Sequence, residues 1–143
     1  MTLATSAHSP HISLQHDEGG EYRPGVCNIG PAEIAKRRRS GHVGVLLTVS
    51  LFALLVALGV PHWMRFIVAL PAAVAASGYL QAYLKFCVGF ATLHVFNFGE
   101  LGPSTKVVDP EARARDRARA TQLLAVTLTI GVAVGLIAVL LPV

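Results

Sequence analysis

Two cysteines and one histidine are the side chains of this sequence with the clearest capacity for chemistry. Cys27 and Cys87 are its only cysteines, and His94 follows Cys87 by two helical turns. Zinc and iron accept thiolates and imidazoles as ligands, and two thiols brought together can also form a redox pair. The cysteines lack the C-x-x-C spacing that marks such sites, so we expect no cofactor. A zinc or iron site at Cys27, Cys87 and His94 is the alternative.

The sequence carries none of the short motifs that would identify an enzyme. It has no P-loop, no dinucleotide-binding glycine pattern, no nucleophile elbow and no H-E-x-x-H pair. No ionisable group lies deep within an apolar run, which argues against transport by a single chain. We therefore expect a protein without catalytic activity.

Three long apolar runs define the architecture that must position these residues. They cover residues 41–60, 63–84 and 120–143, and Arg65 is the one formal charge within them. At a rise of ~1.5 Å per residue, a helix of about 20 residues crosses a hydrocarbon core of roughly 30 Å. With 53% hydrophobic and 14% charged residues, the chain is predicted to be an all-α integral membrane protein with three transmembrane helices.

The other segments divide into a tail, a short helix and a loop. Residues 1–30 are rich in Ser, His, Gly and Pro and lack an apolar period, which predicts a disordered tail. A short basic interfacial helix is expected over 31–40, although a helix continuous with the first span fits the sequence nearly as well. Residues 41–143 form the membrane domain, with a cytoplasmic loop at 85–119. Residues 86–98 fit an interfacial segment, a re-entrant segment or a long helical extension.

The last helix has a clear start signal ahead of the third apolar run. Asp109 can cap this helix, Pro110 suits its first position, and Glu111 follows. We expect the helix that begins here to continue into the third span without a break.

Small residues in the second and third spans indicate where helices pack. In lipid, helices associate through small side chains that let their backbones approach closely. Pro71 is expected to interrupt or kink the second span. The G-x-x-x-G spacing in the third span fits packing within the chain or self-association. The predicted packing residues are Ala72, Ala76, Gly78, Gly131 and Gly135.

Basic residues gather on one side of the predicted spans. If the N-terminus lies in the cytoplasm, Arg65 is the only Lys or Arg on the opposite side. This bias predicts a cytoplasmic N-terminus and an external C-terminus. The cations next to the apolar runs are expected to contact anionic lipid headgroups rather than nucleic acid. They are Lys36, Arg37, Arg38, Arg39, Arg113, Arg115, Arg117 and Arg119.

The chain resembles small uncharacterised bacterial multi-pass membrane proteins in two segments, YRPGVCNIGPAEIAKRRRSGHVG at 22–44 and ASGYLQAYLKFCVGFATLHVFNFGELG at 76–102. The resemblance implies a bacterial inner membrane, but it implies no activity, cofactor or partner. The partners we expect are membrane lipids and either other membrane proteins or further copies of the chain.

The sequence as a whole favours a non-catalytic accessory or assembly component of a larger membrane complex. A short chain with small packing faces and no buried charge offers surfaces to partners but few means of catalysis. The first alternative is a membrane-surface thiol-redox or metal protein that uses Cys27 and Cys87. The second is a homo-oligomeric pore or transporter subunit associated through Gly131 and Gly135.

Overall fold

The computed structural model describes residues 20–142 and is mostly helical. Within this range, three helical segments are long and apolar enough to cross a membrane, as the sequence predicts. The first is α1 (Pro31–Ala57), and the second combines the 3-10 helix η1 (His62–Val68) with α2 (Ala69–Tyr83). The third is α4 (Pro110–Leu140). These helices are those expected of a protein embedded in a membrane.

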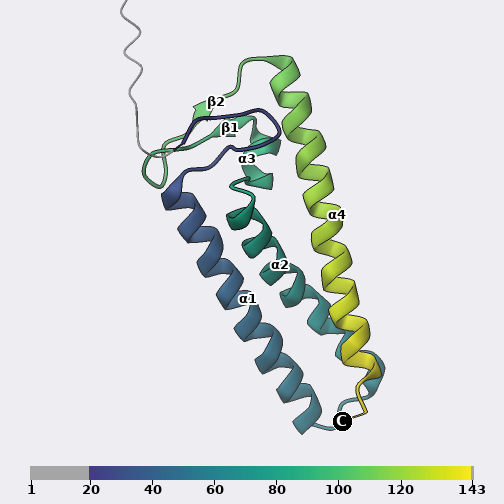
Figure 1. The fold of residues 1–143 in the computed structure, drawn as a ribbon. Helices are drawn as coiled ribbons and strands as arrows, with labels where there is room; N and C mark the ends of the chain where they lie inside the picture. The colour runs from purple at the N-terminus through teal and green to yellow at the C-terminus, as the bar shows by residue number, and fades with distance from the viewer. Residues whose placement is uncertain (1–19, 143) are drawn as a thin grey trace, which may run out of the picture.

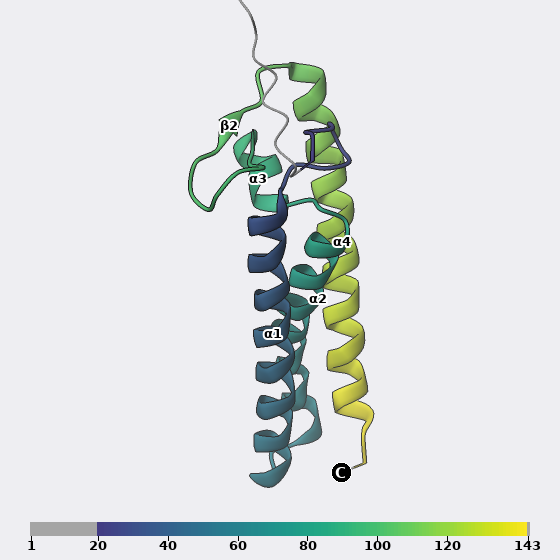
Figure 2. The same ribbon diagram turned by 60° about the vertical axis from the view of Figure 1, so that its left-hand side comes forward.

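The helix α2 lies between α1 and α4 and packs against both of them (Figure 1). The two outer helices diverge toward one end of the bundle, where residues 20–30 and 84–109 also lie. In both Figure 1 and Figure 2, the dark purple segment 20–30 runs from the start of α1 to the side of α4. We call residues 20–30 and 84–109 the cap, and this end of the bundle the capped end.

The helix α1 is continuous from the cap to the far end of the bundle. No separate interfacial helix covers 31–40, so the continuous helix is the arrangement found. Pro31 occupies the first helical position, and Glu33 lies in the first turn. The sequence Ser40-Gly41 does not bend the chain because Gly41 is buried in the contact with α2, where its lack of a side chain is needed.

Glycines bring α1 and α2 into close contact. A Cβ atom on Gly44 would lie 2.5 Å from the backbone nitrogen of Ala75, and one on Gly78 would overlap the backbone of Gly41. Ala72, also on α2, is buried, and Ala76 is half-buried beside it. Close backbone approach of this kind is how helices pack where lipid supplies no hydrophobic force.

Glycines also bring α4 against the second span. A Cβ atom on Gly131 would lie 2.8 Å from the carbonyl oxygen of Ala69, and one on Gly135 would lie 3.0 Å from the ring of Phe66. Both glycines of the G-x-x-x-G pair therefore pack within the chain. The face that a pore of several copies would use is already filled by residues of η1 and α2.

The second span changes from a 3-10 helix to an α-helix just before Pro71. Residues up to Val68 form η1, and Pro71 lies in the first turn of α2, where a residue without an N–H is tolerated. The span is therefore not one uninterrupted α-helix, as the sequence predicts, and the change lies two residues ahead of Pro71.

Residues 86–98 are not part of a long helix that continues α2. They contain the short helix α3 (Val88–Leu93) and the strand β1 (Val95–Phe96), which pairs in antiparallel fashion with β2 (Thr105–Lys106). Phe86 and Ala91 are fully buried against Ala120 and Leu123 of α4, so this segment packs on the bundle end. The predicted start of the last helix is confirmed, because the Asp109 side chain accepts hydrogen bonds from the first turn of α4.

Residues 20–30 correct the expectation of a disordered tail up to residue 30. They are part of the cap, and Ile29 is completely buried. A parallel bridge joins Ile29 to Asn97, and an antiparallel bridge joins Arg23 to Cys27. Long-range hydrogen bonds to α4 and to residues 85–97 hold this segment in place. The composition of the segment does not reveal these hydrogen bonds. The predicted disorder of 1–19 falls outside the residues that the structure describes.

The single charge of the apolar runs lies at the end of the bundle opposite the cap. Arg65 is 4% exposed, and its Nη1 donates to the carbonyl oxygen of Leu141 at 3.3 Å. Leu141 follows the last turn of α4, where carbonyl groups carry partial negative charge. The guanidinium therefore ties η1 to the C-terminal end of α4.

Candidate functional site

A fully buried asparagine joins the two halves of the cap. The Asn28 side chain donates from Nδ2 to the Cys87 carbonyl at 3.0 Å and accepts at Oδ1 from the Cys87 N–H at 2.6 Å. Its backbone N–H donates to the Lys85 carbonyl at 3.1 Å, and its own carbonyl accepts from the N–H of Asn97 at 3.1 Å. Each of these polar groups of Asn28 has a hydrogen-bond partner. The hydrogen bonds offset the cost of removing the side chain from water.

One of the two thiols lies beside this junction and contacts a cation. The Sγ atom of Cys87 accepts from Nη2 of Arg37 at 2.9 Å, and Nη2 also lies 3.6 Å from Oε2 of Glu33. Cys87 is 2% exposed and Glu33 is 3% exposed. Glu33 pairs with Arg37 within α1, as buried charges of opposite sign require. The contact of Arg37 with Cys87 then links α1 to the segment that follows α2.

A buried carboxylate on α4 holds the other side of the cap. Asp116 is completely buried, and its oxygens accept from the hydroxyl of Tyr22 at 2.8 Å and from the N–H of Gly25 at 2.7 Å. Gly25 has φ +71°, a conformation that suits glycine and turns the segment toward Asp116. Burial, followed by the hydrogen bond to Asp116 and its negative charge, raises the pKa of Tyr22 above the ordinary value. Tyr22 therefore remains a hydrogen-bond donor through the neutral pH range.

A polar cavity of about 480 Å³ opens next to Cys27. The cations of Arg23 and Lys85 and the carboxylate of Glu21 lie in its wall, with Ile34 as an apolar side. Lys85 has φ +52°, an uncommon conformation for a residue with a side chain. The hydrogen bond between its carbonyl and Asn28 belongs to the network that holds it there. The wall of the cavity thus carries two cations and one carboxylate.

The predicted metal ligands do not assemble into a site. Among residues 20–142, no group of three His, Cys, Asp or Glu side chains is placed to hold a metal ion. Cys27 and Cys87 are both buried free thiols, and the Sγ of Cys87 contacts Arg37 rather than a second ligand. His94 ends α3 in the left-handed conformation, with φ 56°. Its carbonyl accepts from Val107, which gives it a structural place between α3 and β2.

The basic residues assigned to lipid headgroups divide into two groups. Lys36, Arg38, Arg39 and Arg117 are exposed, and so is Arg115, which pairs with Glu111 at 3.3 Å. The remaining three contact the protein itself: Arg37 through Cys87, Arg113 through the Val107 carbonyl at 2.7 Å, and Arg119 through Gln122 at 3.4 Å. For Arg37 the structure gives a correction, since its guanidinium faces the cap instead of the lipid surface.

Asn28, Glu33 and Asp116 were not predicted as site residues. Asp116 offered one signal, because a single acid lies within the run of alternating arginines at 113–119. For Asn28 and Glu33, the sequence contains no signal that these polar side chains are buried. Their roles depend on partners distant in the sequence, up to 94 residues away for the contact of Tyr22 with Asp116.

The chain has no counterpart in the comparisons with known proteins. No protein family, curated protein or solved structure matches it. The chemistry of the described residues is therefore the basis for its function. Asn28 and Asp116 hold the cap through hydrogen bonds, and both thiols are buried.

Proposed function

We propose that this protein is a non-catalytic accessory or assembly component of a larger membrane complex. The observation that carries the proposal is a ridge of small, exposed residues on α4. Its members recur every four positions, so they follow one line along the helix. They are Thr121, Ala125, Thr129 and Ala133.

The ridge lies apart from the face of α4 that packs inside the bundle. Gly131 and Gly135 face η1 and α2, whereas the ridge residues are exposed. The hydroxyl of Thr121 donates to the Arg117 carbonyl at 3.0 Å, and that of Thr129 donates to the Ala125 carbonyl at 2.9 Å. These bonds satisfy the hydroxyls within α4 and leave a smooth, shallow surface. A second helix can approach such a surface closely, which is the main source of helix association in lipid.

The cap supports an accessory role rather than catalysis. Several of its buried polar side chains bond within the cap or to α4, as in the contacts of Asn28 with Cys87 and of Asp116 with Tyr22. These contacts favour one arrangement of the cap. Such a cap gives a partner a fixed surface at the end of the bundle.

We further propose that the capped end lies in the cytoplasm and that the membrane is a bacterial inner membrane. The capped end carries Lys36, Arg38, Arg39 and Arg117, whereas Arg65 lies at the far end. Lys and Arg near a span resist translocation, which favours a cytoplasmic position for the richer end. The sequence resemblance to bacterial membrane proteins supports the choice of membrane.

The test compares complexes extracted from native membranes in a mild detergent. Ala125→Leu adds bulk at the centre of the ridge without touching the interior of the bundle. We expect the parent protein to migrate in a complex larger than the monomer and Ala125→Leu to migrate as a monomer. The matched control is Ala53→Leu, which adds the same bulk at an exposed position of α1.

Two outcomes would contradict the proposal. One is a parent protein that migrates as a monomer, or an Ala125→Leu variant that keeps the complex intact. The other is recovery of an untagged copy with a tagged copy as the only partner, which would favour a homo-oligomer. Both variants should keep the melting temperature of the parent, because neither position is packed.

A further inference from the structure

One side of the bundle has three hollows. The first has a volume of about 430 Å³ and lies between α1 and α2 at the capped end, against Arg38, Tyr79 and Tyr83. The second and third have volumes of about 220 and 180 Å³ and lie between α1 and α4. These two share residues of α1 and α4, including Val49 and Val134, so they are continuous.

The spacing of the lining residues places all three hollows on one side of the bundle. On α1 the lining residues include Arg38, Val45, Val49 and Phe52, at intervals of 7, 4 and 3 positions. On α2 they include Ala72, Ala76, Tyr79 and Tyr83, at intervals of 4, 3 and 4. Both patterns follow one face of a helix. The first hollow shares no lining residue with the other two, and we call the three together the groove.

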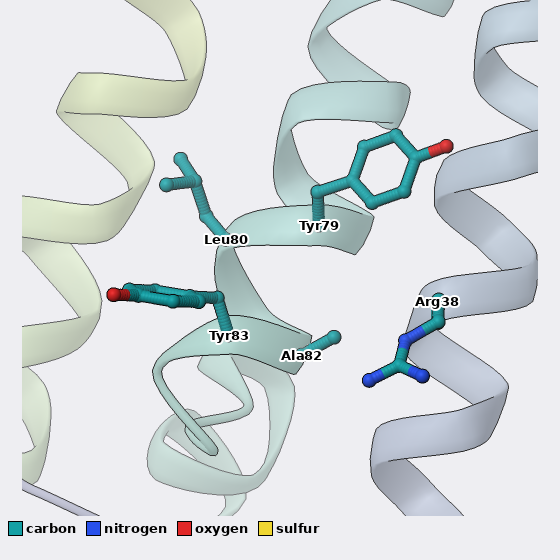
Figure 3. A pocket seen from close by; sticks show the side chains of 5 residues that line it. All are labelled: Arg38, Tyr79, Leu80, Ala82 and Tyr83. Carbon is teal, nitrogen blue, oxygen red and sulfur yellow. The ribbon is translucent and has the colours of Figure 1, made fainter.

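The two ends of the groove differ in chemistry. At the capped end, the guanidinium of Arg38 extends from α1 toward α2, and the ring of Tyr79 extends from α2 toward α1 (Figure 3). His42 holds this ring through a contact of 2.6 Å between its Nδ1 and the Tyr79 hydroxyl. Among residues 20–142, Arg38 takes part in no ion pair. The rest of the groove is lined almost entirely by apolar side chains.

The length and chemistry of the groove favour a phospholipid. From Arg38 to Phe52, α1 rises roughly 21 Å, which exceeds the ~15 Å of one leaflet of the hydrocarbon core. An apolar groove with one cation and two tyrosines at one end matches the acyl chain and the anionic headgroup of such a lipid.

We propose that this groove binds one anionic phospholipid. Its phosphate lies against the guanidinium of Arg38, which can donate two parallel hydrogen bonds to phosphate oxygens. The tyrosines at the mouth lie at the level of the headgroup, where such amphipathic rings are enriched. One acyl chain extends over Ala76 toward Val49. This site is separate from the ridge on α4, so it does not depend on the accessory role.

The test measures lipid binding to the full-length protein by native mass spectrometry in a mild detergent. The probes are phosphatidylglycerol and phosphatidylcholine with identical acyl chains. We expect the parent to bind one phosphatidylglycerol, with several-fold weaker binding of phosphatidylcholine. Arg38→Ala should weaken the binding of phosphatidylglycerol by about tenfold, since a charge-assisted pair is lost. Ala76→Phe should weaken both lipids, because it fills the apolar part of the groove.

The matched control is Arg39→Ala, which removes an equally exposed cation from the next residue of α1. It should change the affinity by less than about twofold, as Arg39 does not line the groove. Equal binding of the two lipids, or equal losses in Arg38→Ala and Arg39→Ala, would overturn the proposal. Release of a protein partner by Ala76→Phe in native membranes would place a helix in the groove and overturn it as well. Arg38 is exposed, so its variant folds normally.

Discussion

Asn28 is the residue on which the order of the cap depends most. It is the only side chain described here that bonds both backbone groups of a residue 59 positions away. Its backbone groups also connect Lys85 with Asn97. Cys87 lies at the centre of this junction with both of its backbone polar groups committed to Asn28. The reactivity of the Cys87 thiol is therefore a measure of whether this junction is intact.

Asn28→Asp preserves the shape of the side chain but replaces the Nδ2 donor with an acceptor. The Cys87 carbonyl then loses its partner, at a cost of about 1–3 kcal/mol for an unsatisfied buried group. We expect Cys87 to react with a maleimide about tenfold faster or more in this variant, measured in a Cys27→Ser background. Gln122→Glu makes the same chemical change at an exposed position of α4 and serves as the control. An unchanged labelling rate in Asn28→Asp would show that the junction does not hold the cap.

At the scale of elements, the glycines of α1 and α4 determine how closely α2 is held. Two of them lie against backbone atoms: Gly44 approaches Ala75, and Gly131 approaches Ala69. A backbone cannot move aside as the end of a flexible side chain can. Substitution at these positions therefore separates whole helices.

Gly44→Leu should weaken the packing of α1 against α2 much more than a substitution on the outer face of α1. Its Cβ would lie 2.5 Å from the Ala75 nitrogen, and such overpacking costs about 1–3 kcal/mol or more. We expect Gly44→Leu to have a lower melting temperature in detergent. Melting is measured as the loss of the helical circular dichroism signal. Ala53→Leu adds a larger side chain where α1 is exposed and should melt like the parent. Equal melting of the two variants would contradict the assigned contact.

The elements were more predictable from the sequence than the cap was. Apolar run length located the three spans, and Asp109 with Pro110 located the start of α4, because these signals are local. The order of residues 20–30 depends on pairs such as Asn28 with Cys87, which no periodicity connects. Pro71 marked the change in the second span, because proline is tolerated in the first turn of an α-helix but not in its interior. The groove likewise arises only when α1 and α4 lie on either side of α2.

At the scale of the whole molecule, the first and last described residues lie at opposite ends of the bundle. The described chain enters at the capped end, and the last described residues lie beside Arg65 at the other end. Three crossings of one bundle require this arrangement. The basic residues exposed at the capped end then decide which compartment that end faces.

The orientation can be tested with single cysteines in a variant that lacks Cys27 and Cys87. Ser104→Cys places an exposed thiol in the cap, and His62→Cys places one at the far end. In intact bacterial cells with a permeable outer layer, a membrane-impermeant maleimide should label His62→Cys but not Ser104→Cys. Both positions should react after the membrane is disrupted. Labelling of Ser104→Cys alone in intact cells would reverse the orientation.

The helical segments differ in length, so more of the protein extends beyond the apolar region at one end of the bundle than at the other. At ~1.5 Å per residue, the 31 residues of α4 extend about 46 Å, well beyond a hydrocarbon core of roughly 30 Å. The surplus projects at the capped end, while Val60, Pro61 and η1 form a tight return at the other. For a bundle that spans a bilayer, the ordered residues outside the hydrocarbon core would then lie mainly on one side, within the described chain. On the opposite side, a binding partner would find little surface beyond the short connection between α1 and η1.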